Sequence, residues 1–117
     1  MDEPWGWHLL LDCTAGLQVH SKENIINFVK ELVVTIDMIP FGEPWIERFA
    51  THDENKAGYS FCQMITTSNI TGHFVEKNGN FFIDVFSCKE FNPALVSLVV
   101  KKYFNPLTIK QKLVLRG

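Results

Sequence analysis

The 117-residue sequence lacks the marks of several large protein classes. Its three cysteines, Cys13, Cys62 and Cys88, are an odd number at wide spacing, which excludes a disulfide framework and a C-x-x-C metal site. Its four histidines show no ligand spacing, and no run reaches the roughly 18–20 apolar residues of a membrane span. The acidic start, MDEPWGWH, differs from a signal peptide. We therefore expect a soluble cytoplasmic protein with no metal and no membrane partner.

Positive charge is also scarce. The chain has 11 Lys and Arg against 13 Asp and Glu, which gives a formal net charge of −2. Nucleic-acid binding needs a clustered basic face, so we expect no nucleic-acid partner. The densest basic group is more typical of a solvated surface; it comprises Lys101, Lys102, Lys110, Lys112 and Arg116. With neither repeats nor low-complexity segments, residues 1–117 are expected to form a single domain.

Apolar residues at spacings of three and four predict two amphipathic helices. The first covers residues 22–39, with Ser21 as its cap and Pro40 and Gly42 at its end. Its apolar stripe includes Ile36 and Ile39. The second begins at Pro93, after an Asn92 cap. We expect its apolar side chains to face one way; they are Leu95, Val96, Leu98, Val99, Val100 and Tyr103.

Alternating or continuous apolar runs predict six strands, at residues 7–13, 45–51, 59–67, 70–76, 81–88 and 107–117. Asn78-Gly79 is typical of a hairpin turn, and Ser68 and Asn69 fall where a turn between two strands is expected. The order β-α-β-β-β-β-α-β predicts an α/β (α+β) two-layer sandwich. Two helices can cover one face of its mostly antiparallel sheet. The other face needs a partner, for which a homodimer is the simplest arrangement.

Four features in this order resemble one family. They are HLLLD near the N-terminus, GYS, TTSNITGH, and FFIDVFSC followed by an acidic residue, a proline and a helix. Together they resemble the prokaryotic S-adenosylmethionine decarboxylase proenzymes, which are small pyruvoyl enzymes of polyamine synthesis. His8 and Asp12 match that family's opening His-Leu-x-x-Asp/Glu. The similarity covers essentially the whole chain and is tightest from Gly58 to Pro93.

The resemblance assigns roles to four residues. Ser68 takes the position of the serine that becomes the pyruvoyl group and forms a Schiff base with the substrate. Ser60, eight residues earlier, and His73, five residues later, take the positions that handle protons during self-cleavage. Cys88, twenty residues after Ser68, takes that of the general acid that reprotonates the product carbon. The bond to be cleaved is then Thr67–Ser68.

Decarboxylation of an amino acid explains why such residues are needed. Loss of the carboxylate leaves a carbanion at Cα, and no ordinary side chain offers an electron sink for it. A pyruvoyl group made from the chain itself supplies that sink. Taken singly, each residue also has an ordinary structural interpretation. Ser68 is a turn former, Cys88 a small buried side chain and His73 a hydrogen-bonding partner on a strand.

The resemblance also implies the substrate, S-adenosylmethionine, and a product used in spermidine synthesis. Phe49 and Glu76 are candidates to contact that substrate. The chain departs from the family pattern at Thr67, where glutamate is usual, at Asn69, where histidine is usual, and in the missing Trp-Pro-Glu after His73. Two alternatives therefore stay open: a pyruvoyl decarboxylase of ornithine or arginine, and a non-processing homologue that acts as a binding or regulatory module.

Overall fold

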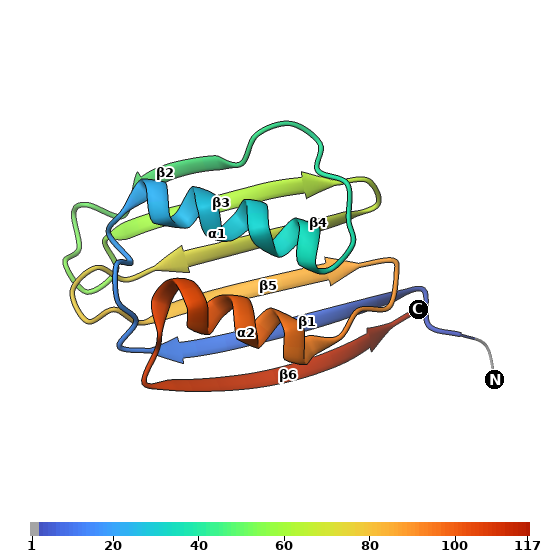
Figure 1. Ribbon diagram of the computed structural model, residues 1–117. Helices are drawn as coiled ribbons and strands as arrows, with labels where there is room; N and C mark the ends of the chain where they lie inside the picture. The colour runs from blue at the N-terminus through green and yellow to red at the C-terminus, as the bar shows by residue number, and fades with distance from the viewer. Residues whose placement is uncertain (1–2) are drawn as a thin grey trace.

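The computed structural model describes residues 3–117, and its elements follow the predicted order (Figure 1). They are β1 (Gly6–Thr14), α1 (Lys22–Thr35), β2 (Trp45–Phe49), β3 (Gly58–Ile65), β4 (Ser68–Phe74), β5 (Phe81–Ser87), α2 (Pro93–Phe104) and β6 (Thr108–Arg116). The six strands form one sheet in the order β2-β3-β4-β5-β1-β6. Every neighbouring pair is antiparallel, so the predicted "mostly antiparallel" sheet is antiparallel throughout.

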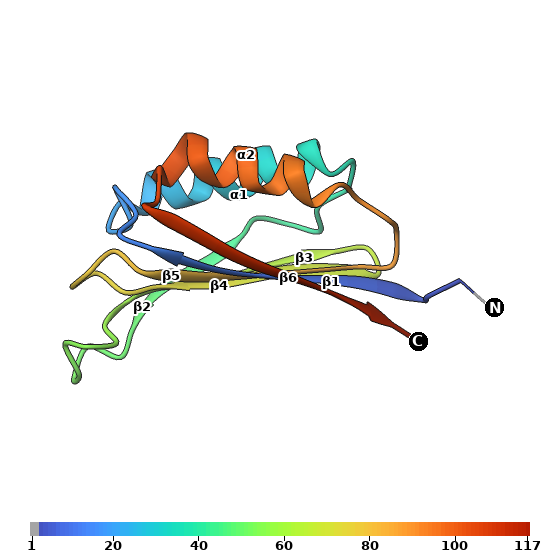
Figure 2. The same cartoon turned by 90° about the horizontal axis from the view of Figure 1, so that it is seen from below.

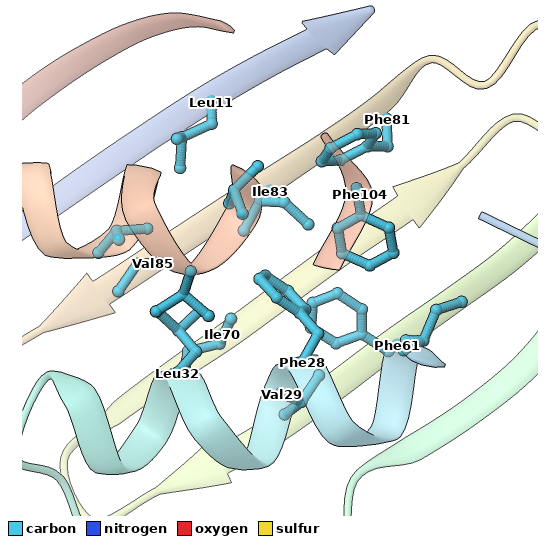
Figure 3. Packing of buried hydrophobic residues seen from close by; sticks show 14 of the residues in the cluster. Leu11, Phe28, Val29, Leu32, Phe61, Ile70, Phe81, Ile83, Val85 and Phe104 are labelled. Atoms are coloured by element: carbon cyan, nitrogen blue, oxygen red, sulfur yellow. The ribbon is translucent and has the colours of Figure 1, made fainter. Parts of the chain in front are cut away.

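Both helices lie on the same face of the sheet, which confirms the two-layer α+β sandwich (Figure 2). The core between the layers is rich in aromatic side chains, several of which Figure 3 shows together. Phe104 of α2 lies with its ring centroid 5.0 Å from that of Phe28 on α1 and 5.0 Å from that of Phe81 on β5. Such tilted contacts at this distance are favourable beyond the area they bury. One cluster therefore joins both helices to the centre of the sheet.

The helices begin where the sequence predicts. Ser21 accepts a hydrogen bond from the Asn24 N–H at 3.1 Å, and Asn92 caps the helix that Pro93 opens. The predicted end of α1 at Ile39 is wrong, because the chain turns at Asp37, where φ is +57°. The Met38 N–H bonds back to the Val33 carbonyl, and this Schellman closure satisfies the last turn four residues earlier than predicted.

The apolar stripe of α2 is narrower than predicted. Leu98 is 60% exposed and Leu95 39% exposed, although both were expected to face the sheet. The buried positions follow a spacing of four from Val96 through Val100 to Phe104, with Val99 beside them. Since each residue turns the helix by about 100°, Leu95 lies on the flank of this stripe and Leu98 on the opposite, solvent-facing side.

The connection between β3 and β4 also differs from the prediction. The turn consists of Thr66 and Thr67, whereas Ser68 and Asn69 already belong to β4. The predicted turn at Ser68 and Asn69 is therefore wrong by two residues. Thr67, the second residue of this two-residue turn, adopts the left-handed conformation, with φ at +62°.

The sheet face opposite the helices, here called the open face, is covered by no element of residues 3–117 (Figure 2). Strand alternation and register place His73, Ser60 and Asp84 on it. It also carries large exposed apolar side chains, namely Trp45, Phe49, Met64 and Phe82, with exposed fractions of 65%, 48%, 55% and 43%. In residues 3–117 no helix is long and apolar enough to cross a membrane.

Candidate active site

Ser68 is the first residue of β4 and lies at the end of the sheet where β5 also ends, at the right-hand side of Figure 1. Its side chain is buried, with 6% of its surface exposed. The Ser68 hydroxyl oxygen accepts a hydrogen bond from the backbone N–H of Cys88 at 3.3 Å. The structure thus brings together the serine and the cysteine that the sequence resemblance singled out.

Thr67, which would carry the cleaved carbonyl, has an unfavourable backbone conformation. Six non-glycine residues among 3–117 have a positive φ, and Thr67 is the β-branched one. A β-branched side chain in this region clashes with its own backbone and costs on the order of 1–2 kcal/mol. Strain of this kind is often found at reactive backbone positions.

The Cys88 side chain lies over the same turn. Its Sγ is 2.6 Å from Thr67 Oγ1. The neighbouring Ser87 is fully buried and holds the chain in place, because its hydroxyl accepts from the Lys89 N–H at 3.0 Å and donates to the Lys89 carbonyl at 2.6 Å. Ser87 was not among the predicted site residues. A serine on the otherwise apolar helix-facing side of β5 was the signal that could have found it.

Ser60 and His73 form a second pair, as cross-strand partners on β3 and β4. Ser60 Oγ lies 2.6 Å from His73 Nδ1, and His73 Nε2 lies 2.7 Å from the Lys56 carbonyl oxygen. Since a carbonyl can only accept, Nε2 carries the hydrogen. In the neutral ring Nδ1 is then an acceptor, and the Ser60 hydroxyl donates to it. This arrangement suits a residue that takes up and returns protons.

The two pairs lie at opposite ends of β4. Five residues separate Ser68 from His73 along an extended strand, a span of about 17 Å. Ser60 is directly opposite His73 and is therefore equally remote. Within one chain, the residues expected to assist cleavage do not reach the bond to be cleaved.

Phe49 and Glu76 belong to the His73 end. Phe49 lies opposite Gly58 and lines a recess of about 140 Å³ together with Trp45, Glu47 and Ser60. Glu76 accepts two hydrogen bonds from the Arg48 guanidinium, one of them at 3.0 Å. This pairing holds the pKa of Glu76 below its usual value. Phe49 and Glu47 therefore form an aromatic, partly acidic surface beside the Ser60–His73 pair, whereas Arg48 and Glu76 lie on the helix-facing side of the same end.

The remaining candidates have structural partners. His8 Nε2 lies 3.1 Å from Asp84 Oδ1 on the open face, and Asp12 lies four residues further along β1. Burial, with a smaller contribution from Asp12, raises the pKa of Cys13 to about 12, which makes that thiol unreactive. Within residues 3–117 no three His, Cys, Asp or Glu side chains are placed to hold a metal ion.

Comparison with known proteins decides the family. The family model described as S-adenosylmethionine decarboxylase matches residues 7–117. The chain belongs to this family. Among curated relatives, the S-adenosylmethionine decarboxylase proenzymes of two Clostridium botulinum type A strains are each 28% identical over 116 residues, which cover 96% of this chain and 94% of theirs.

The fold agrees with this assignment. The crystal structure of the adenosylmethionine decarboxylase from Aquifex aeolicus superposes with a TM-score of 0.80, covering 99% of this chain and 93% of that one at 17% identity. The resemblance predicted from HLLLD, GYS, TTSNITGH and FFIDVFSC is thereby confirmed.

Proposed function

We propose that the chain is a self-cleaving, pyruvoyl-dependent decarboxylase of S-adenosylmethionine that supplies the decarboxylated product for spermidine synthesis. One observation carries the proposal. The buried Ser68 hydroxyl directly follows strained Thr67 and lies against Cys88. A nucleophile, a carbonyl under strain and a proton donor therefore share one turn.

Self-cleavage begins with attack of Ser68 Oγ on the carbonyl carbon of Thr67. The C–N bond between the two residues breaks, an ester forms, and the Ser68 nitrogen becomes a free amine. Elimination then breaks the ester C–O bond, and Thr67 leaves as a carboxylate. Water finally replaces the nitrogen, ammonia departs, and residue 68 is left as a pyruvoyl group. The balance is one water taken up and one ammonia released.

The site fits such a group. It is covalently attached at residue 68, so it needs no ligand set of its own, and the Cys88 side chain lies over the same turn. When present, the pyruvoyl group supplies the electron sink for decarboxylation. The chain's own contribution is to shield residue 68 from water and to hold a thiol where a proton must return to the product carbon.

We infer that the working unit is a homodimer with a shared site. Ser60 and His73 lie about 17 Å from Ser68 along β4, too far to assist within one chain. A two-fold axis parallel to the open face and perpendicular to the strands reverses strand direction in the second copy. It therefore places the His73 end of one sheet beside the Thr66–Thr67 turn of the other, at the end of β4, where the Ser68 side chain itself points to the helix-facing side. The same packing covers the exposed Trp45 and Met64 of the open face.

The proposed two-fold dimer also determines which copy contributes the substrate contacts. Phe49 lies on the open face at the His73 end, so a shared site receives it from the second copy, whereas Glu76 lies at the same end on the helix-facing side. An aromatic face attracts a sulfonium cation as well as an adenine ring. This favours S-adenosylmethionine over ornithine or arginine, which carry no ring to stack.

Release of CO₂ by purified, cleaved protein tests the substrate. We expect turnover of carboxyl-labelled S-adenosylmethionine and none of labelled ornithine or arginine. Turnover of either basic amino acid in place of S-adenosylmethionine would overturn the substrate assignment. A protein that turns over none of the three would support the alternative of a binding or regulatory module.

A further inference from the structure

The side chain of Thr67 has two polar neighbours. Its Oγ1 donates a hydrogen bond to the backbone carbonyl of Thr66 at 2.6 Å. The same oxygen lies 2.6 Å from the Sγ of Cys88. Thr67 occupies the position where the family usually has glutamate, so this contact is a feature of the present chain.

The direction of the second hydrogen bond follows from counting protons. A hydroxyl group has one hydrogen and two lone pairs, whereas a carbonyl oxygen can only accept. The Thr67 hydrogen is therefore committed to the Thr66 carbonyl. Toward Cys88 the Thr67 oxygen can offer only a lone pair, and the thiol must donate its S–H to it.

We propose that Thr67 is a positioning residue whose hydroxyl oxygen accepts the Cys88 S–H and aims the thiol across the turn. A hydrogen bond to the neutral form of a group favours that form. The thiol can act as a general acid only while it holds its proton, and that role rests on the proposed function. After cleavage Thr67 is the last residue of the N-terminal fragment, so this fragment supplies part of the site that the other fragment carries.

The other polar groups around Cys88 are already engaged. The Ser68 hydroxyl accepts from the backbone N–H of Cys88. The ammonium of Lys89, the adjacent charged residue, donates hydrogen bonds to the Asp37 carboxylate at 2.6 Å and to the Asp37 backbone carbonyl at 3.0 Å. The hydrogen bond from this ammonium, and then its positive charge, lower the pKa of Asp37. Thr67 is therefore the side-chain hydrogen-bond partner of the thiol within residues 3–117.

Alkylation of Cys88 by iodoacetamide tests the proposal in a background that cannot self-cleave. All proteins carry Ser68→Ala, and peptide mass mapping follows each cysteine separately. Thr67→Val preserves the shape of the side chain but removes the acceptor, so Cys88 should be alkylated about three- to tenfold faster near pH 7, the range expected for one neutral hydrogen bond. At a pH high enough to ionise the thiol fully, the two rates should converge.

Three controls are available in the same chain. Thr67→Ser restores the hydroxyl and should return the slow rate, and Thr66→Val alters a neighbouring exposed threonine without removing the acceptor. Cys62 should react at the same rate in every variant. Cys13 is buried, with 1% of its surface exposed, so its protection reports that each variant is folded.

An unchanged Cys88 rate in Thr67→Val would overturn the proposal. A slower rate would overturn it too, because it would mean that the hydroxyl donates to sulfur and stabilises the thiolate. A difference that persists undiminished at high pH would show that Thr67 only blocks access. All of these outcomes are read in uncleaved protein, so they are independent of whether the natural chain cleaves itself.

Discussion

Two inactive variants should restore each other when mixed. Ser68→Ala has no nucleophile, and His73→Ala lacks the proton carrier, so neither should cleave alone. Because Ser68 and His73 lie about 17 Å apart on β4, the proposed shared site takes the His73 that serves a given Ser68 from the second copy. In a mixed dimer, the His73→Ala chain keeps its own Ser68 and receives an intact His73 from its partner.

The expected yield follows from dimer symmetry. Random assortment of equal amounts makes about half of all dimers mixed, and each mixed dimer has one complete site. About half of the His73→Ala chains should therefore be cleaved, while the Ser68→Ala chains stay whole. Co-expression with two affinity tags, followed by denaturing electrophoresis and intact mass, measures both chains in one sample.

A matched control removes the complementing residue. Mixing His73→Ala with the double variant Ser68→Ala/His73→Ala leaves no site with both groups and should give no cleavage. The reasoning is refuted if the first mixture stays uncleaved although mixed dimers are recovered by their tags. It is also refuted if Ser68→Ala/His73→Ala restores cleavage as well as Ser68→Ala does.

Three further predictions concern the scaffold. Gln63 is 2% exposed and its two amide hydrogens are shared among three backbone carbonyls, so Gln63→Leu should lower the free energy of unfolding in urea by about 1–3 kcal/mol; an unchanged midpoint would contradict this. A Cβ on Gly58 would lie 1.7 Å from the Phe74 carbonyl oxygen, so Gly58→Ala should force β3 and β4 apart, lower the melting temperature and slow cleavage. Arg48 lowers the pKa of Glu76, so the pair contributes its full stabilisation at pH values above the ordinary glutamate pKa. This stabilisation is lost as the pH falls through the lowered pKa of Glu76. Between about pH 5 and pH 3, the free energy of unfolding of Arg48→Met should therefore fall less than that of the natural chain. Parallel plots of this free energy against pH would refute the prediction.

Local sequence signals predicted the elements well where one physical preference dominated. Asn92-Pro93 determined the start of α2, and alternation along residues 81–88 identified β5. The end of α1 was harder, because Ile36 and Ile39 continue the apolar spacing while the chain closes at Asp37. The turn at Thr66 and Thr67 could not be inferred from residue type, since β-branched residues disfavour the conformation that Thr67 adopts.

The sequence predicted only part of how the candidate site residues group in space. The spacing that links Ser68 to Cys88 through the family resemblance agrees with their contact in space. The same resemblance suggests that Ser60 and His73 also lie near Ser68, yet antiparallel pairing places them at the far end of the strand. Spacing along the chain does not state which copy of a chain a residue serves. The length of β4 and the uncovered open face support the proposal that these residues serve the second copy.

The intact mass of the full-length protein after incubation tests self-processing most directly. The mechanism predicts two fragments, residues 1–67 and 68–117, that together weigh about 1 Da more than the uncleaved chain, because water enters and ammonia leaves. Simple hydrolysis between Thr67 and Ser68 would instead add about 18 Da and leave an ordinary serine, which lacks the carbonyl that this chemistry requires. A single species at the mass of the full chain, or fragments with the mass of simple hydrolysis, would contradict a pyruvoyl enzyme.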